Sequence, residues 1–266
     1  MENKIVVLIT GCSTGIGREL CKILYNKGYT VVATARKVED LKDLPAALKL
    51  PLDVTKEESV HKAIKEVMLN FHKIDILVNN AGYSVRGALE EVNVSDVKSM
   101  FNVNVFGIIN MLQAVIPEMR KRKTGKIINI GSISGKFVQP INGAYCAAKF
   151  AVEALSDALR LELSSYNIQT TVIEPGPIKT NFFKTLAENS NSVISNLNSC
   201  YSYFYQKDSK YRKKQKQADP TETATTISNI ILKEHLSSRY KVAVPFTYSM
   251  ITHFPDFLKE LFMKNI

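Results

Sequence analysis

A glycine-rich turn between a predicted strand and a predicted helix constrains this chain more than any other feature. The apolar run at residues 4–10 predicts a buried strand, and residues 18–26 have helical apolar spacing. Between them the glycines follow a G-x-x-x-G-x-G spacing, which lets the backbone turn tightly and approach a pyrophosphate at a helix N-terminus. Such a turn can also be purely structural. If the turn binds phosphate, we expect the cofactor to be contacted by Gly11, Ser13, Thr14, Gly15, Ile16 and Gly17.

Strands and helices alternate along most of the chain. Further strands are expected at residues 29–35, 48–52, 75–78, 126–130, 168–173 and 241–244. Helical patterns cover residues 57–71, 94–121, 144–165 and 220–236. This order predicts an α/β protein with a single-domain Rossmann fold over residues 1–266, a doubly wound parallel sheet of about seven strands with helices on both faces. Residues 181–217, rich in Ser, Asn and Tyr, interrupt the rhythm and predict a partly helical, mobile insertion that binds substrate.

The composition narrows the class of protein. With 266 residues, 45% hydrophobic and 23% charged, the chain suits one globular domain and not a disordered or fibrous protein. Its longest apolar runs, residues 5–9 and 242–244, are far shorter than the roughly 20 residues of a membrane span, so we expect no transmembrane helix. Residues 1–4 lack the pattern of a secretory signal, and we expect a cytoplasmic protein.

Charge and cysteines add few constraints. The net charge of +10 lies largely in residues 120–123 and 207–216, where cations suit a helix end and a solvated loop, so no nucleic-acid partner is expected. The four cysteines lack Cys-x-x-Cys spacing, and reduced thiols without a metal site are expected. Cys146 adjoins Tyr145, but a small buried residue is favoured over a reactive thiol.

The second predicted strand ends at Arg36, where dinucleotide-binding folds commonly place an acidic residue that binds ribose hydroxyls. A guanidinium can instead pair with a 2′-phosphate and stack on adenine, which favours NADP(H) over NAD(H). Lys37 can assist. The alternative is an ordinary surface arginine.

Tyr145 and Lys149 lie four residues apart, which places the phenol and the ammonium on one helical face. A nearby cation stabilises a phenolate and lowers the pKa of the tyrosine, so that the pair could exchange a proton with a substrate oxygen. Tyr and Lys occur at this spacing often by chance. A surface pair is therefore the alternative, and only the wider sequence decides between the two.

The wider sequence resembles the classical short-chain dehydrogenase/reductase family. The segments TGCSTGIG, NNAG, NVFG, GS, YCAAK and PGPIKT appear in the family's order between Thr10 and Thr180. The resemblance implies that Tyr145 is the general acid/base and that Lys149 tunes it and binds the nicotinamide ribose. It also implies that Ser132 holds the substrate oxygen and that Asn104 supports a water-mediated proton relay.

The same resemblance implies further cofactor contacts. Asp53 and Val54 would line the adenine pocket, and Asn80, Ala81 and Gly82 the ribose region. The nicotinamide would be contacted by Pro175, Gly176, Ile178 and Thr180. Structural alternatives remain open: Asp53 could cap a helix, Asn80 could tie neighbouring strands, and residues 175–176 could form only a turn.

These features predict an NADP(H)-dependent oxidoreductase that transfers hydride between the nicotinamide and a carbonyl or alcohol. The residues expected at the substrate mouth favour an apolar substrate: Tyr83, Phe137, Val138, Pro140, Phe182 and Phe183. Residues 144–163 followed by EPGP resemble the branch of hydroxysteroid and retinol dehydrogenases and bacterial aldehyde reductases, which implies a steroid, retinoid or aldehyde-like substrate. The alternatives are an NADP-binding sensor or scaffold with little turnover, and a basic surface-binding protein.

Two expectations concern partners. The resemblance implies a homodimer or homotetramer formed through the helices at residues 94–121 and 144–165. Residues 250–262 are apolar enough to rest on a membrane surface, but packing over the pocket or against another subunit is favoured for so short a segment. Pro255 limits a continuous helix there.

Overall fold

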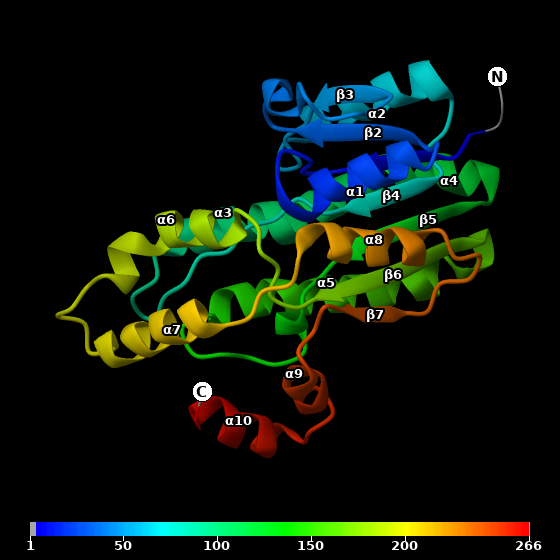
Figure 1. Ribbon diagram of the computed structural model, residues 1–266. Coiled ribbons are helices and arrows are strands. Elements are labelled where there is room, and N and C mark those ends of the chain that lie inside the picture. Colours follow the sequence, from blue (N-terminus) through cyan, green and yellow to red (C-terminus); the bar gives the residue numbers. More distant parts are fainter. Residues whose placement is uncertain (1–3, 266) are drawn as a thin grey trace.

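A computed structural model describes residues 4–265 (Figure 1). Its centre is a seven-stranded parallel sheet in the order β3-β2-β1-β4-β5-β6-β7. The order reverses between β1 and β4, the place where open α/β sheets bind ligands beyond their carboxyl ends. The strands are β1 (Val6–Ile9), β2 (Thr30–Ala35), β3 (Leu48–Pro51), β4 (Ile76–Asn79), β5 (Gly125–Ile130), β6 (Ile168–Pro175) and β7 (Arg239–Val242).

Helices cover both faces of the sheet, which confirms the predicted fold class (Figure 1). The α-helices are α1 (Gly15–Asn26), α2 (Glu57–Phe71), α3 (Val94–Phe101), α4 (Gly107–Arg122), α5 (Gly143–Glu162), α6 (Phe182–Ile194), α7 (Ser202–Lys214), α8 (Pro220–Ile231), α9 (Phe246–Ile251) and α10 (Asp256–Asn265). Short helical turns are η1 (Val38–Leu41), η2 (Asn102–Phe106), η3 (Ile133–Gly135) and η4 (Ser164–Tyr166).

Side chains of β1 point alternately to two cores, as the period of a strand requires. Val6 and Leu8 pack with residues of α2, α4 and α5 on one face. Val7 and Ile9 pack with residues of α1 and α8 on the other. Both faces of the central strand are therefore buried, which explains its uninterrupted apolar sequence.

The predicted helix at residues 94–121 differs from the structure at its centre. Residues Asn102–Phe106 form a π-helical turn, η2, between α3 and α4. The helical segment Val94–Arg122 is 29 residues long and contains an 18-residue window with a mean hydropathy of 1.4. By length and composition alone it could cross a membrane. Here Met111, Val115 and Met119 are fully or almost fully buried beneath the sheet, so this is a core helix of the domain.

The last strand begins two residues earlier than predicted and ends at Val242. The prediction placed the strand on the apolar residues 242–244. The strand instead includes the polar Arg239, which pairs with Val172 of β6. Ala243 then has a φ of +53°, which ends the strand. The chain outside the sheet is helical: α6 and α7 occupy most of residues 181–217, and α9 and α10 are separated at Pro255, as expected.

Candidate active site

A cavity of about 960 Å³ lies where the carboxyl ends of the parallel strands meet. Most of the residues predicted for the site line it. They are Gly11, Ser13, Thr14, Gly15, Ile16, Arg36, Asp53, Val54, Asn80, Ala81, Gly82, Ser132, Tyr145, Lys149, Pro175, Gly176, Ile178 and Thr180. Gly17 and Asn104 are not among the lining residues, and both support residues that are.

The backbone of the glycine turn lies so close to residues 80–81 that a side chain on Gly11 or Gly17 would clash with them. Gly11 has a φ of +72°, and a Cβ there would lie 2.9 Å from the Cα of Ala81. At Gly17 a Cβ would lie 2.4 Å from the amide nitrogen of Asn80. The first glycine therefore forms the cradle, and Gly17 lets the helix pack against the next loop.

The N-terminus of α1 opens toward the cavity. Thr14 precedes the helix in an extended conformation, and among the described residues its hydroxyl makes no capping hydrogen bond. The amides of the first turn are thus left for another acceptor, and a helix N-terminus of this kind favours an anion. A cradle that a Cβ would fill and an uncapped helix end both fit a dinucleotide pyrophosphate.

Asn80 ties β4 to the glycine turn. Its side-chain amide donates to the carbonyl oxygens of Thr10 (2.9 Å) and Gly11 (3.0 Å). The Thr10 hydroxyl in turn accepts from the backbone amides of Asn80 and Ala81, both at 3.0 Å. Asn80 therefore ties neighbouring segments, as in the structural alternative, and it also lines the cavity.

The two residues expected near the adenosine differ in how they are held. Arg36 is exposed at the end of β2 and faces the cavity. Asp53 closes its own turn before α2, since its Oδ1 accepts from the amide (3.0 Å) and the hydroxyl (2.7 Å) of Thr55. Asp53 does not cap α2, since Lys56 precedes the helix and makes no side-chain cap; the alternative of a helix cap is therefore wrong, and Asp53 lines the cavity while it closes this turn.

Ser132, Tyr145 and Lys149 come together at one wall of the cavity. Lys149 Nζ lies 5.8 Å from the centre of the Tyr145 ring and donates to the Ile130 carbonyl oxygen at 2.8 Å. Ser132 leads into η3, and its Oγ accepts from the Ser134 amide at 3.1 Å. Tyr145 also packs edge-on against Phe182, with ring centres 5.8 Å apart.

The protonation of Tyr145 differs from the sequence-based expectation. Burial raises the pKa of the Tyr145 phenol well above its ordinary value, and the Ser132 hydroxyl opposes this rise only in part. The expected lowering by Lys149 is therefore wrong for this structure, because desolvation dominates. Burial also lowers the pKa of Lys149 to about 8, and the Glu153 carboxylate opposes that shift. Burial therefore favours the uncharged form of each group, the phenol of Tyr145 and the amine of Lys149.

Asn104 lies behind the lining, within the π-helical turn. Its Oδ1 accepts from the Tyr83 amide (3.0 Å) and its Nδ2 donates to the Tyr83 carbonyl oxygen (2.8 Å). Its side chain is almost fully buried. In this structure Asn104 thus fixes the loop that carries Gly82 and Tyr83, while its role in a proton relay stays a prediction.

Residues 5–191 match the family model described as short chain dehydrogenase. The chain belongs to this family. A 3-ketodihydrosphingosine reductase of Bacteroides thetaiotaomicron is 35% identical, over 89% of this chain and 87% of that protein. A probable short-chain type dehydrogenase/reductase, VdlC, of Helicobacter pylori is 40% identical, over 76% and 78% respectively.

Solved structures support the same assignment. A short-chain dehydrogenase from Streptomyces avermitilis superposes with a TM-score of 0.78 at 28% identity, covering 99% of this chain and 95% of that one. ElxO with NADP bound gives a TM-score of 0.76 at 26% identity, covering 93% and 99%. The chain is therefore an oxidoreductase of the short-chain dehydrogenase family, and its cavity suits a nicotinamide cofactor.

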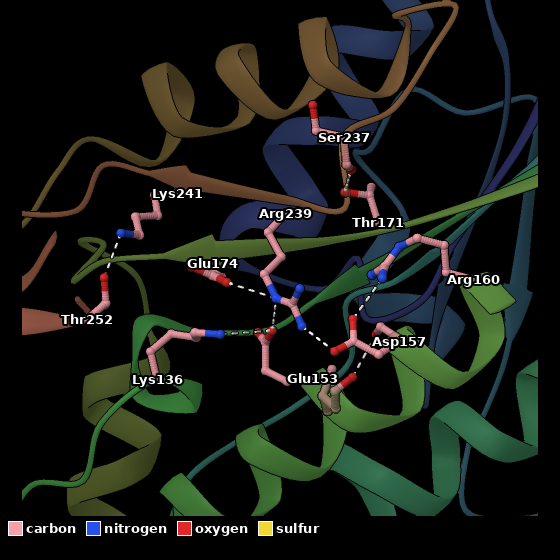
Figure 2. A network of polar contacts seen from close by, with 12 residues as sticks. Lys136, Glu153, Asp157, Arg160, Thr171, Glu174, Ser237, Arg239, Lys241 and Thr252 are labelled. Carbon is pink, nitrogen blue, oxygen red and sulfur yellow. Dashed lines mark hydrogen bonds and ion pairs between the residues drawn. The ribbon is translucent and has the colours of Figure 1, made fainter. Parts of the chain in front are cut away.

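In this short-chain dehydrogenase an ion-pair network holds the wall behind Lys149 (Figure 2). Arg239 of β7 donates to Glu153 Oε2 at 2.7 Å and to Asp157 Oδ2 at 2.5 Å, and its Nε lies 3.7 Å from Glu174 Oε1. Glu153 is one helical turn beyond Lys149. The network therefore joins β6 and β7 to the helix that carries Tyr145 and Lys149.

The substrate end of the cavity was predicted only in part. Phe137, Phe182 and Phe183 line the cavity as expected, whereas Val138 and Pro140 do not. Tyr83 also lines the cavity. Burial raises the pKa of its phenol, Asp96 raises that pKa further and Arg36 lowers it, so Tyr83 belongs to the cofactor end near Arg36. Sequence reasoning missed several lining residues because no motif marks them: Arg86, Gln139, Asn142, Leu186, Gln215 and Tyr248.

Proposed function

We propose that this short-chain dehydrogenase is an NADP(H)-dependent reductase of apolar carbonyl compounds, which it converts to alcohols. The observation that carries the proposal is the position of the buried Tyr145 phenol. It shares a wall with Ser132 and Lys149, in the same cavity as the open N-terminus of α1. A proton donor beside a dinucleotide site suits carbonyl reduction.

The residues of the chain perform the proton half of the reaction. Ser132 and Tyr145 donate hydrogen bonds to the carbonyl oxygen and stabilise the charge that develops on it. Tyr145 then gives its proton to that oxygen, and the ammonium of Lys149 stabilises the resulting phenolate. Bound NADPH supplies the hydride for the carbonyl carbon. Oxidation of the alcohol uses the same groups in reverse, with Tyr145 as the base.

Arg36 supports the preference for NADP(H). It is exposed, lines the cavity at the end of β2 and is followed by the exposed Lys37. A guanidinium pairs with a phosphate through charge-assisted hydrogen bonds, whereas a ribose without the phosphate offers it no anion. The NADP in the similar ElxO structure agrees with this proposal.

Apolar residues support the substrate class. Phe182 and Phe183 from α6 pack edge-on, with ring centres 6.0 Å apart, and both line the cavity with Leu186. Their place in the lining supports a part for the inserted residues 181–217 in substrate binding. The name of the relative that reduces 3-ketodihydrosphingosine supports a carbonyl substrate.

Self-association and a cytoplasmic location stay predictions. Three exposed apolar residues belong to the two segments expected to form the interface: Phe106, at the end of η2, and Phe150 and Leu161, on α5. An interface there would cover them.

The test is Tyr145→Phe, which removes the transferable proton and retains the ring. We expect turnover of a panel of apolar aldehydes and ketones with NADPH to fall by about a thousandfold, within the range for loss of a general acid. Calorimetry should show that NADPH still binds. Tyr203→Phe, on an exposed tyrosine, is the matched control and should keep full turnover. Near-native rates in Tyr145→Phe would overturn the mechanism, and NADPH binding by the wild type without turnover of any compound would indicate a sensor or scaffold.

A further inference from the structure

A buried arginine lies at the substrate end of the cavity, outside every motif of the family pattern. Arg86 follows the loop that Asn104 holds, and it is only 9% exposed although it lines the cavity. Burying a guanidinium is costly unless the charge is paired and the N–H groups are bonded. Its surroundings therefore show what the site is built to hold.

Asp208 of α7 pairs with Arg86 but does not balance the local charge. Arg86 Nη1 donates to Asp208 Oδ1 at 2.5 Å, and Arg212 Nε donates to Asp208 Oδ2 at 2.6 Å. All three side chains are largely buried, with exposed fractions of 10%, 13% and 16% for Arg86, Asp208 and Arg212. Two guanidinium groups share one carboxylate, so the group carries one excess positive charge.

The hydrogen bonds of Arg86 are also incomplete. Its Nε is buried and has no hydrogen-bond partner among residues 4–265. A guanidinium has five N–H donors, and those of Arg86 are thus not exhausted by Asp208. The excess charge of a residue that lines the cavity suits an anion from outside the chain, and the unpartnered Nε shows that the surrounding residues do not satisfy this guanidinium.

The charge of Arg86 reaches the reacting groups of the site. It lowers the pKa of the Tyr145 phenol on one side and that of Tyr248 on the other, against the rise that burial causes in each. The carboxylates that line the cavity are Asp53 and Asp96, and the charges that act on Arg86 include neither of them. The substrate end therefore carries the positive charge of Arg86, beside the apolar rings of Phe182 and Phe183 and uncharged polar side chains such as Gln139.

We propose that Arg86 forms an anion-binding subsite and that the substrate carries a carboxylate in addition to the carbonyl reduced beside Tyr145. The inference rests on the proposed reductase function and refines its substrate class to amphipathic oxo-carboxylates, with the apolar part against Phe182 and Phe183. A carboxylate is the expected anion because its two oxygens match the planar fork of a guanidinium.

Two roles of Arg86 can be distinguished by substitution: docking of α7 through Asp208, and binding of a substrate carboxylate. If Arg86 served only to dock α7 through Asp208, removing either partner would have the same consequence. If Arg86 binds substrate, Asp208→Asn removes a competing carboxylate and should keep or strengthen binding of an acid. Adding Arg86→Gln to Asp208→Asn should then abolish that binding, and this double variant leaves no buried carboxylate without its partner.

The experiment compares ω-oxo carboxylates of graded chain length with their methyl esters, using NADPH and measuring kcat/KM. One charge-assisted hydrogen bond corresponds to roughly a tenfold or larger preference for the acid at the best length, in wild type and in Asp208→Asn. The double variant should lose this preference. Lys210→Gln removes one positive charge from an exposed site on α7, the helix that carries Asp208, and should keep the preference for the acid.

Binding separates this inference from the reductase function. Saturated carboxylates of the same lengths and their amides are titrated calorimetrically into the NADP⁺ complex, a measurement that needs no turnover. Acid binding that depends on Arg86, without reduction of any oxo compound, would support the subsite and overturn the reductase proposal. Reduction with equal preference for acid and ester at every length, or an acid preference that survives in the double variant, would overturn the subsite.

Discussion

The two ends of the cavity are built by different means. At the cofactor end, the segments that follow β1 and β4 are joined by Asn80, whose backbone amide donates to the Thr10 hydroxyl and whose side-chain amide donates to the Thr10 carbonyl oxygen. At the substrate end, side chains of the loop between β4 and α3 meet side chains of α7, which is distant in the sequence. Arg86 binds Asp208 of α7, and Tyr205 of α7 donates to Glu91 at 2.5 Å.

This difference teaches which parts of the site can vary independently. The cofactor end depends on small residues and backbone positions, so most substitutions there disturb the fold and the ligand together. The substrate end depends on side chains of α6, α7 and α9 outside the sheet, where one residue can be exchanged while the cradle persists. Substitutions at the cofactor end should therefore have the larger effects.

Gly11→Ala should break the cofactor end most severely. The new Cβ would lie 2.9 Å from the Cα of Ala81 and would require a side chain at a φ of +72°. Overpacking of this kind typically costs about 1–3 kcal/mol, and the shifted turn should weaken NADPH binding by as much as about a hundredfold. Fluorescence titration of NADPH measures the loss.

Gly28→Ala is the matched control for that substitution. Gly28 also has a positive φ, +87°, but a Cβ there would meet no heavy atom of the described residues within 4 Å. It should cost some stability in a thermal melt and leave NADPH affinity unchanged. Equal losses of affinity in the two variants would show that backbone strain, and not the contact with Ala81, is responsible.

The same contrast explains what the sequence could predict. The glycine turn and Asn80 follow the ends of β1 and β4, and Tyr145 and Lys149 are four residues apart on α5, so short sequence motifs mark all of them. The helix at residues 57–71 was predicted with its observed bounds because its apolar spacing coincides with its buried face. The bounds of that helix follow from local sequence, whereas the roles of Asn80, Tyr145 and Lys149 also required the order of the family motifs between Thr10 and Thr180.

Features that depend on tertiary contacts escaped prediction. Arg239 belongs to β7 because carboxylates of α5 and β6 surround it, which no local pattern indicates (Figure 2). The raised pKa of Tyr145 depends on burial by neighbours, among them Phe182 from the inserted helix. Arg86 becomes notable only when α7 brings Asp208 beside it.

Arg36→Asp tests whether the cofactor end reads the 2′-phosphate at this one position. The carboxylate would repel that phosphate and accept hydrogen bonds from ribose hydroxyls, so the ratio of kcat/KM for NADH to that for NADPH should rise by about thirtyfold. Lys42→Asp makes the same charge change at an exposed residue that does not line the cavity, and should leave the ratio unaltered. A ratio that stays constant in Arg36→Asp would place phosphate recognition elsewhere.

Phe183→Ala should affect only the substrate end, and by the smallest factor. Phe183 is partly exposed at the cavity wall and packs edge-on against Phe182, so its loss removes part of an apolar contact surface. Loss of about 1 kcal/mol corresponds to a roughly fivefold higher KM for an apolar aldehyde. The KM for NADPH should not change, because Phe183 belongs to α6 and not to the glycine turn. Phe257→Ala, at an exposed ring of α10, should change neither constant. If Phe183→Ala instead weakened NADPH binding as well, α6 would contribute to both ends of the cavity, and the two ends could not be varied independently.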